Sequence, residues 1–379
     1  MKNIKRLSIV SMAIIIAIAS SNKVFAKEEK ELKLSQPKVL SLTLQEAFDK
    51  VKKDNVELKM LDEKITILNR MYDRKHAKAI EADNSGRSDV ETKKTALLYA
   101  SRAAEDVDNA EKDKDNRIKE LKREVEKEYL NIVNCNKEVE NTKKTLRNLQ
   151  REIEKVNANI DQGTAVENAL TPLKLQKMQL ETSLNPLKAQ KEESEVRLRQ
   201  YLNVDENTTL NFINNKKEFI KYDDSKINLV IKEALAGNYD LKKMNKELEF
   251  AKLEVEIYEK YGRNVLDAES SQKIRVNDLE NSLCNLRSNV QVNMWKVYFD
   301  LKNKEALVEI EKLNLDNSAS KLKEAETKYK NGLIDELQFD LAKLSFEKQN
   351  IVFEKAVNDY MINVDGFKDL LELESIKIK

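Results

Sequence analysis

Mostly apolar residues recur at intervals of three and four over long stretches of this chain, and this spacing constrains the fold more than any other feature. One run ends just before Gly163, and a second run in the same register ends just before Gly332. The first run comprises Val139, Thr142, Leu146, Leu149, Ile153, Val156 and Ile160, and the second comprises Val308, Leu315, Leu322, Ala325 and Tyr329, with Glu311 and Ser318 at two seam positions. Such spacing places side chains on one face of an α-helix, and its seven-residue period predicts coiled-coil-like packing.

The composition favours long helices. Of the 379 residues, 6 are Gly and 3 are Pro, whereas 36 % are charged, so residues that break helices are rare. We predict an all-α fold with helices from near Asp89 to Ile160 and from near Val265 to Tyr329, each roughly 100 Å long at about 1.5 Å per residue. Neither helix can bury its apolar stripe alone, so both must pack on other helices or on other subunits.

The helical pattern occurs twice. Asn55-Val-Glu-Leu58 in the first half of the chain aligns with Asn238-Tyr-Asp-Leu241 in the second half, and Gly163 aligns with Gly332. We interpret the chain as two tandem copies of one long antiparallel helical hairpin. At each tip the glycine is expected to end a helix in the left-handed conformation. The predicted order is an N-terminal segment at 27–43, repeat 1 at 44–203 with its tip at 161–164, a connector at 204–226, and repeat 2 at 227–374 with its tip at 331–333.

The segment 1–26 has the pattern of a secretory signal peptide. A basic start is followed by an apolar run and then by Val24-Phe25-Ala26, which offers small residues at a cleavage site. We therefore expect an exported protein. Export permits disulfides, but Cys135 and Cys284 lie at different distances from their tips, so we predict two free thiols packed on helices.

Three short motifs resemble the TolC family of outer-membrane efflux ducts. They are Leu-Thr-Leu-Gln-Glu-Ala at 42–47, the Asn-x-Glu/Asp-Leu motif that follows it, and Lys-Tyr-x-x-Gly-Leu-Ile at 328–334. The motifs occur in the family's order and spacing, and the resemblance covers essentially the whole mature chain. It implies a homotrimer whose long helices form a tunnel. It also implies two partners, an adaptor (membrane fusion) protein and an ABC-type or other inner-membrane pump. Adaptor contact is implied at the hairpin tips, which places it at Gly163, Thr164, Gly332 and Leu333.

One part of the family pattern is missing from this sequence. The resemblance implies strands of a membrane β-barrel near 73–117 and 256–290, but neither stretch alternates apolar and polar residues over the nine or ten positions that a membrane strand needs. We predict that the barrel is absent. A cell-envelope location is expected, and an outer-membrane one is implied by the resemblance alone.

Acidic residues follow both tips, at Glu167, Asp335, Glu336 and Asp340. Two interpretations stay open. The carboxylates could form a cation-binding ring at the end of a tunnel, or they could be the ordinary acidic residues that a helix N-terminus favours.

Patterns typical of enzymes and of nucleic-acid binding are missing. The sequence has one histidine, His76, no Cys/His cluster with metal-ligand spacing and no glycine-rich phosphate loop. The net charge of +1 does not favour nucleic acid. We predict a protein that is not an enzyme and carries no cofactor.

Two functional hypotheses share this fold. The first is an exported TolC-like duct or spacer of an efflux or secretion system, which docks an adaptor through its tips. The second is an exported coiled-coil scaffold of the cell envelope without a role in transport. A closed oligomer around a lumen would favour the first, and a monomer or antiparallel dimer would favour the second.

Overall fold

The computed structural model describes residues 39–212, 217–262 and 266–372. The predicted signal peptide and residues 27–38 lie outside the described residues, and so do 213–216, 263–265 and 373–379. All described residues belong to one unit, Lys38–Lys379. Its elements are β1 (Val39–Leu42), α1 (Leu44–Asp54), α2 (Val56–Asn84), α3 (Val90–Lys94), the π-helical turn η1 (Thr95–Tyr99), α4 (Ala100–Asp161), the 3₁₀ turn η2 (Glu167–Ala169), α5 (Leu170–Leu202), β2 (Thr209–Phe212), α6 (Ile227–Gly237), α7 (Tyr239–Tyr261), α8 (Leu266–Lys330) and α9 (Glu336–Leu370).

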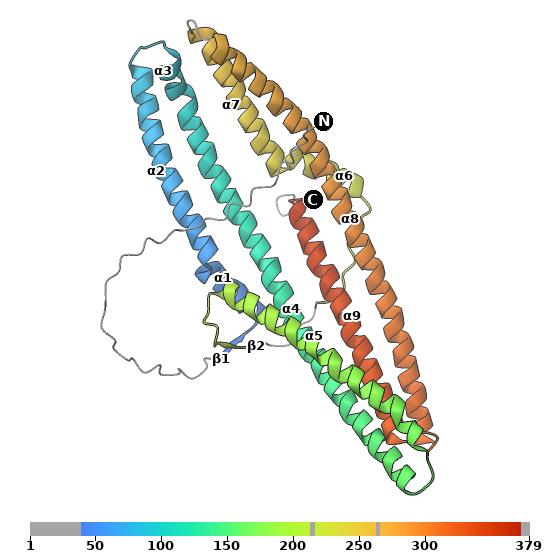
Figure 1. The fold of residues 1–379 in the computed structure, drawn as a ribbon. Coiled ribbons are helices and arrows are strands. Elements are labelled where there is room, and N and C mark those ends of the chain that lie inside the picture. Colours follow the sequence, from blue (N-terminus) through green and yellow to red (C-terminus); the bar gives the residue numbers. More distant parts are fainter. Residues whose placement is uncertain (1–38, 213–216, 263–265, 373–379) are drawn as a thin grey trace, which may run out of the picture. The chain divides into compact units, whose positions relative to one another are not determined.

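The long helices of the prediction are confirmed. Helices α3, η1 and α4 follow one another without a gap from Val90 to Asp161, and α8 contains 65 residues. Helix α5 turns back along α4, and α9 turns back along α8 (Figure 1). The two stretches 73–117 and 256–290 are helical apart from short connections, and their described residues contain no strand. The helical-hairpin fold class is therefore correct.

The two repeats begin in the same way. In repeat 1, Asn55 separates α1 from α2, and its side-chain oxygen accepts a hydrogen bond from the backbone N–H of Leu58 at 3.2 Å. In repeat 2, Asn238 separates α6 from α7 and accepts from Leu241 N–H at 3.1 Å. A side-chain acceptor at a helix start satisfies a backbone donor that has no partner within the helix, so each Asn begins a new helix at this point.

A short pair of strands was not predicted. Strands β1 and β2 pair in parallel, with Leu42 opposite Phe212, so the segment before repeat 1 is joined to the connector between the repeats. The hydroxyl of Tyr129, on α4, donates to the carbonyl of Leu42 at 3.2 Å, and its ring meets Phe212 edge to face. The connector is thus held against the body of the unit.

Each repeat has its own apolar core. Repeat 1 packs α1, α2, α4 and α5 around residues such as Ala47, Val125 and Leu198, whereas repeat 2 packs α6 to α9 around residues such as Met294 and Phe367. Both cysteines are free, as predicted, but Cys135 is buried and Cys284 is exposed, so only Cys135 is packed within the unit. Among the described residues, none of the helices contains a stretch long and apolar enough to cross a membrane.

Candidate functional site: the hairpin tips

The tip of repeat 2 closes around Gly332. Its φ is 70°, the left-handed conformation that glycine adopts without steric cost. The N–H of Gly332 donates to the carbonyl of Tyr329 at 3.0 Å, and the N–H of Leu333 donates to the carbonyl of Lys328 at 2.8 Å. These two bonds form a Schellman motif, which satisfies the last carbonyls of α8 and turns the chain toward α9.

The tip of repeat 1 repeats this geometry at Gly163, whose φ is 71°. The N–H of Gly163 donates to Ile160, and the N–H of Thr164 donates to Asn159, both at 2.8 Å. The hydroxyl of Thr164 donates to the same carbonyl at 2.9 Å. The predicted left-handed glycines are therefore present at both tips, and the two turns have one backbone design.

The tips differ in how the next helix begins. In repeat 2, the carboxylate of Asp335 accepts from the N–H of Gln338 at 2.9 Å, and the Gln338 side chain accepts from Asp335 N–H at 3.3 Å. This reciprocal capping box starts α9 directly. The equivalent position in repeat 1 is Val166, which offers no acceptor, and a 3₁₀ turn (Glu167–Ala169) precedes α5. Both residues of the box differ in repeat 1, where Val166 and Ala169 stand in place of Asp335 and Gln338.

Both tips expose apolar side chains. Leu333 and Val166 are each 71 % exposed, while Thr164 is exposed beside Gly163. An exposed Leu at the end of a rigid hairpin is suited to insertion into a partner's pocket, because its burial there would contribute about 2 kcal/mol. Repeat 2 adds a stacked pair, Tyr329 on Phe339, with 5.0 Å between the ring centroids. The sequence singled out Leu333 but not this aromatic pair.

Two of the four acidic residues after the tips, Asp335 and Asp340, have ion-pair partners. Lys155 of α4 donates to the Asp335 carboxylate at 2.5 Å, and this bond together with Gln338 N–H lowers the pKa of Asp335 below its ordinary 3.8. Asp340 pairs with Lys343 at 3.0 Å. Glu167 and Glu336 are exposed in the first turns of their helices. Within the described residues, no group of three or more His, Cys, Asp or Glu side chains is arranged to hold a metal ion.

A polar seam joins the two hairpins along α4 and α9. We call it the α4–α9 seam and define it by five side-chain interactions that cross between these helices. Asn141 and Asn148, both buried on α4, each donate from their amide to a backbone carbonyl of α9. From the interactions that cross between the two helices, these five are Lys137–Glu354 (2.6 Å), Asn141 to the Leu344 carbonyl (3.0 Å), Lys144–Glu347 (3.3 Å), Asn148 to the Leu337 carbonyl (3.1 Å) and Lys155–Asp335 (2.5 Å).

This seam was not predicted from the sequence. Its members follow the three- and four-residue spacing of α4 at positions beside the apolar stripe, so a polar stripe next to the apolar one was the available signal. The two asparagines stand two helical turns apart, and so do the carbonyls that they contact. Because the two spacings are equal, both amide bonds can form only in one register of α9 on α4.

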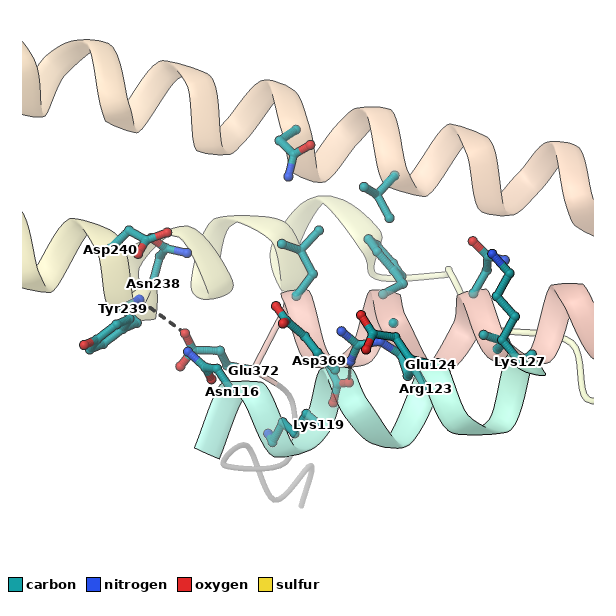
Figure 2. Close-up of a pocket in the computed structure, with 18 residues that line it drawn as sticks. Asn116, Lys119, Arg123, Glu124, Lys127, Asn238, Tyr239, Asp240, Asp369 and Glu372 are labelled. Carbon is teal, nitrogen blue, oxygen red and sulfur yellow. Dashed lines mark hydrogen bonds and ion pairs between the residues drawn. The ribbon is translucent and has the colours of Figure 1, made fainter. Parts of the chain in front are cut away.

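One of the described cavities lies away from the tips. It measures about 570 Å³ and is lined from α4, α7, α8 and α9 (Figure 2). Its charged groups lie close to one another: Arg123 pairs with Asp369, and the N–H of Tyr239 donates to Glu372 at 3.2 Å. Burial, followed by the negative charge of Asp113, raises the pKa of Tyr239 to about 12. Among the described lining residues there is no His, Cys or Ser, so this cavity lacks the nucleophiles and the base that catalysis uses most often.

Comparison with solved structures identifies the fold. The channel protein CusC superposes with a TM-score of 0.64 and 10 % identity, over 86 % of this chain and 91 % of that one. The outer membrane protein VceC of Vibrio cholerae gives 0.61 and 10 %, over 86 % and 95 %. The CmeC outer membrane channel of Campylobacter jejuni gives 0.60 and 12 %, over 96 % and 94 %.

No protein-family model matches the sequence, and no curated protein does either. These structures are channel or outer membrane proteins, and the fold that the resemblance to the TolC family implies is confirmed. The likeness covers 86 % or more of this chain and is a likeness of fold.

Proposed function

We propose that this protein is the helical subunit of a TolC-like duct in an efflux or secretion system of the cell envelope. It carries no catalytic role: its helices form the wall of a passage, and its tips dock an adaptor protein that links the duct to an inner-membrane pump. The observation that carries the proposal is the shared fold over both repeats, with two glycine-closed tips at one end of paired hairpins.

The geometry of the tips supports a docking role. Both turns are closed by internal hydrogen bonds, so their shape is set before any partner arrives, which lowers the ordering cost of binding. Leu333 extends from such a turn and is 71 % exposed. We propose Gly163, Thr164, Gly332 and Leu333 as the contact residues. The acidic residues Glu167, Asp335, Glu336 and Asp340 flank this contact and serve chiefly as helix starts and ion-pair partners.

The duct proposal is tested by measuring the mass of the mature protein in solution, with and without detergent. The particles are then imaged. The expected result is a closed homo-oligomer, a trimer by analogy with the fold, that encloses a solvent-filled lumen. A monomer or an antiparallel dimer without a lumen would instead support the envelope scaffold and end the duct proposal.

Docking is tested separately with Leu333→Asp in the full chain. A photo-crosslinker placed at Thr164 is expected to capture an envelope adaptor in the producing cell, and the Leu333→Asp variant is expected to lose that capture. The matched control is Ile274→Asp, which changes another well-exposed apolar residue, near the start of α8 and far from the tip. Equal capture by both variants would contradict the role of the tips.

A further inference from the structure

Another cavity lies on the α4–α9 seam and carries more positive charge than the ion pairs of the seam use. It measures about 330 Å³, and its described lining residues all come from α4 and α9 of one chain. They are Lys144, Arg147, Asn148, Arg151, Asp340, Lys343, Leu344 and Glu347. Four basic side chains thus face two acidic ones, which is a formal excess of two positive charges.

The two arginines supply this excess, because each carboxylate in the cavity already has a lysine partner. The pairs are Lys144–Glu347 (3.3 Å) and Lys343–Asp340 (3.0 Å). Arg147 and Arg151 stand four positions apart on α4, on one face of the helix, and neither forms an ion pair with a described residue. A guanidinium presents its N–H donors in a planar fork that matches the oxygens of a phosphate group. Two such groups side by side indicate an oxyanion as the ligand.

The same cavity contains a hydrogen-bond acceptor without a donor. Asn148 is 6 % exposed, and its side-chain N–H donates to the carbonyl of Leu337 at 3.1 Å. This bond fixes the orientation of the amide, because the reversed amide would place its oxygen against the carbonyl oxygen. The Oδ1 of Asn148 is therefore buried, and no described residue donates to it. Leaving a buried acceptor unpaired is costly, so a ligand that brings its own donor is favoured here.

The next cavity along the seam has neither feature. It measures about 190 Å³, and its described lining includes two basic and three acidic side chains, which are Lys137, Lys144, Glu140, Glu347 and Glu354. Asn141 lines it and also donates to a carbonyl of α9, but its oxygen is not left both buried and unpaired. Along this part of the seam, the unpaired arginines and the unpaired buried oxygen therefore occur in the same cavity.

We propose that this cavity binds hydrogen phosphate, with the guanidiniums of Arg147 and Arg151 on its charged oxygens and its O–H donating to the Oδ1 of Asn148. The unpaired acceptor selects the ion. Hydrogen phosphate keeps one O–H at neutral pH, whereas sulfate has none and a phosphate ester is mostly its unprotonated dianion. Either of these would turn a lone pair toward the Asn148 oxygen. Inorganic phosphate satisfies the cations and the acceptor together.

Bound phosphate also connects the two hairpins. The arginines belong to α4, whereas Lys343 on the opposite wall belongs to α9, so an anion between them bridges the seam where Asn148 already sets its register. The site lies within one chain, so it goes beyond the proposed duct and does not depend on assembly. Because the unfolded chain has no such cavity, binding stabilises the folded chain increasingly as the phosphate concentration rises.

Three dianions of equal charge test the proposal on the full mature chain. At about pH 8, inorganic phosphate, sulfate and methyl phosphate all carry two negative charges, but only inorganic phosphate retains an O–H. Isothermal titration calorimetry at one low ionic strength is expected to show saturable binding of phosphate and binding about tenfold weaker for the other two, the effect of one lost hydrogen bond. Absence of saturable phosphate binding, or equal affinity for all three ions, would overturn the proposal.

Substitutions assign the binding to the arginines. Arg147→Gln and Arg151→Gln should each weaken phosphate binding about tenfold, since each removes a charge-assisted contact. Lys143→Gln is the matched control, because Lys143 is an exposed cation of the same stretch of α4 that does not line the cavity. Its affinity for phosphate should stay within about twofold, as exposed charges outside the site are screened. If Lys143→Gln weakened binding as much as Arg151→Gln, phosphate would be responding to the general charge of the helix, and the proposed site would be wrong.

Asn148→Ala tests the selectivity separately from the stability of the fold. The variant should bind phosphate and sulfate with equal affinity, because the acceptor that distinguishes the two ions has been removed. The ratio of the two affinities is the readout, and far-ultraviolet circular dichroism checks that the variant is folded. A folded variant that still prefers phosphate to sulfate would show that Asn148 does not select the ligand, contrary to the proposal.

Discussion

Replacing Gly332 by Ala should lower the free energy of unfolding by about 1–2 kcal/mol, the intrinsic penalty that an L-residue pays in the left-handed conformation. The φ of Gly332 is 70°, and a Cβ atom added there would meet no other atom within 4 Å. Crowding by neighbours is therefore excluded, and only the backbone penalty remains. Gly163→Ala should cost the same, because its φ is 71° and its surroundings are equally open.

The chain supplies a matched control for this change. Gly237 is the last residue of α6, its φ lies outside the left-handed region, and an added Cβ would again meet nothing within 4 Å. Gly237→Ala makes the same chemical change in a compatible conformation. It should stabilise the protein by about 0.4–1 kcal/mol, because alanine loses less backbone entropy on folding. The two substitutions are thus expected to have opposite signs.

Urea unfolding followed by far-ultraviolet circular dichroism measures both variants. All proteins must be compared at one chain concentration, because assembly adds to apparent stability. The reasoning is supported if the dependence of the unfolding free energy on urea concentration is unchanged while the urea midpoints of the two variants shift in opposite directions. If Gly332→Ala were neutral, or if both variants moved in the same direction, the left-handed turn at the tip would not be present in solution.

Two further predictions concern the α4–α9 seam. Asn148→Ala removes the amide that donates to the Leu337 carbonyl and should cost about 1 kcal/mol in urea unfolding, while Asn317→Ala, its exposed counterpart, should be neutral in a monomer. Asp335 has a folded-state pKa below its ordinary 3.8, so its stabilising contribution is complete above pH 3.8 and is lost as the pH falls below that value. The stability difference between the unsubstituted protein and Asp335→Asn should therefore shrink in acid unfolding below pH 3.8, and a difference that is constant with pH would contradict the ion pair with Lys155.

The tips could be located from the sequence because the interactions that form them join residues close together in the chain. A glycine between two helical runs in a chain with 6 glycines marks a left-handed residue, since other residues pay for that conformation. The helix starts at Asn55 and Asn238 are local in the same sense, as each side chain caps a backbone group three positions away. Interactions of this range leave a signal in a single stretch of sequence.

The strand pair and the seam left no such signal. Strands β1 and β2 have 4 residues each and come from opposite ends of repeat 1, so each stretch is too short for its pattern to identify a strand. The spacing along α4 predicts that it has an apolar side, but it does not say which helix lies on the polar side. That information requires the packing of α9 on α4, and only then do Asn141 and Asn148 acquire a role.

The α4–α9 seam contributes more to the register of α9 on α4 than to the stability of the fold. Its ion pairs are partly exposed, and exposed pairs contribute about 0–1 kcal/mol each. Its two asparagines are buried, however, and sliding α9 by a single position would remove both amide bonds together and leave polar groups buried without partners. A contact that is weak in energy but strict in register fixes the position of one tip relative to the other. That is what a docking surface made of two hairpins needs, because a partner that contacts Thr164 and Leu333 together requires a fixed separation between them.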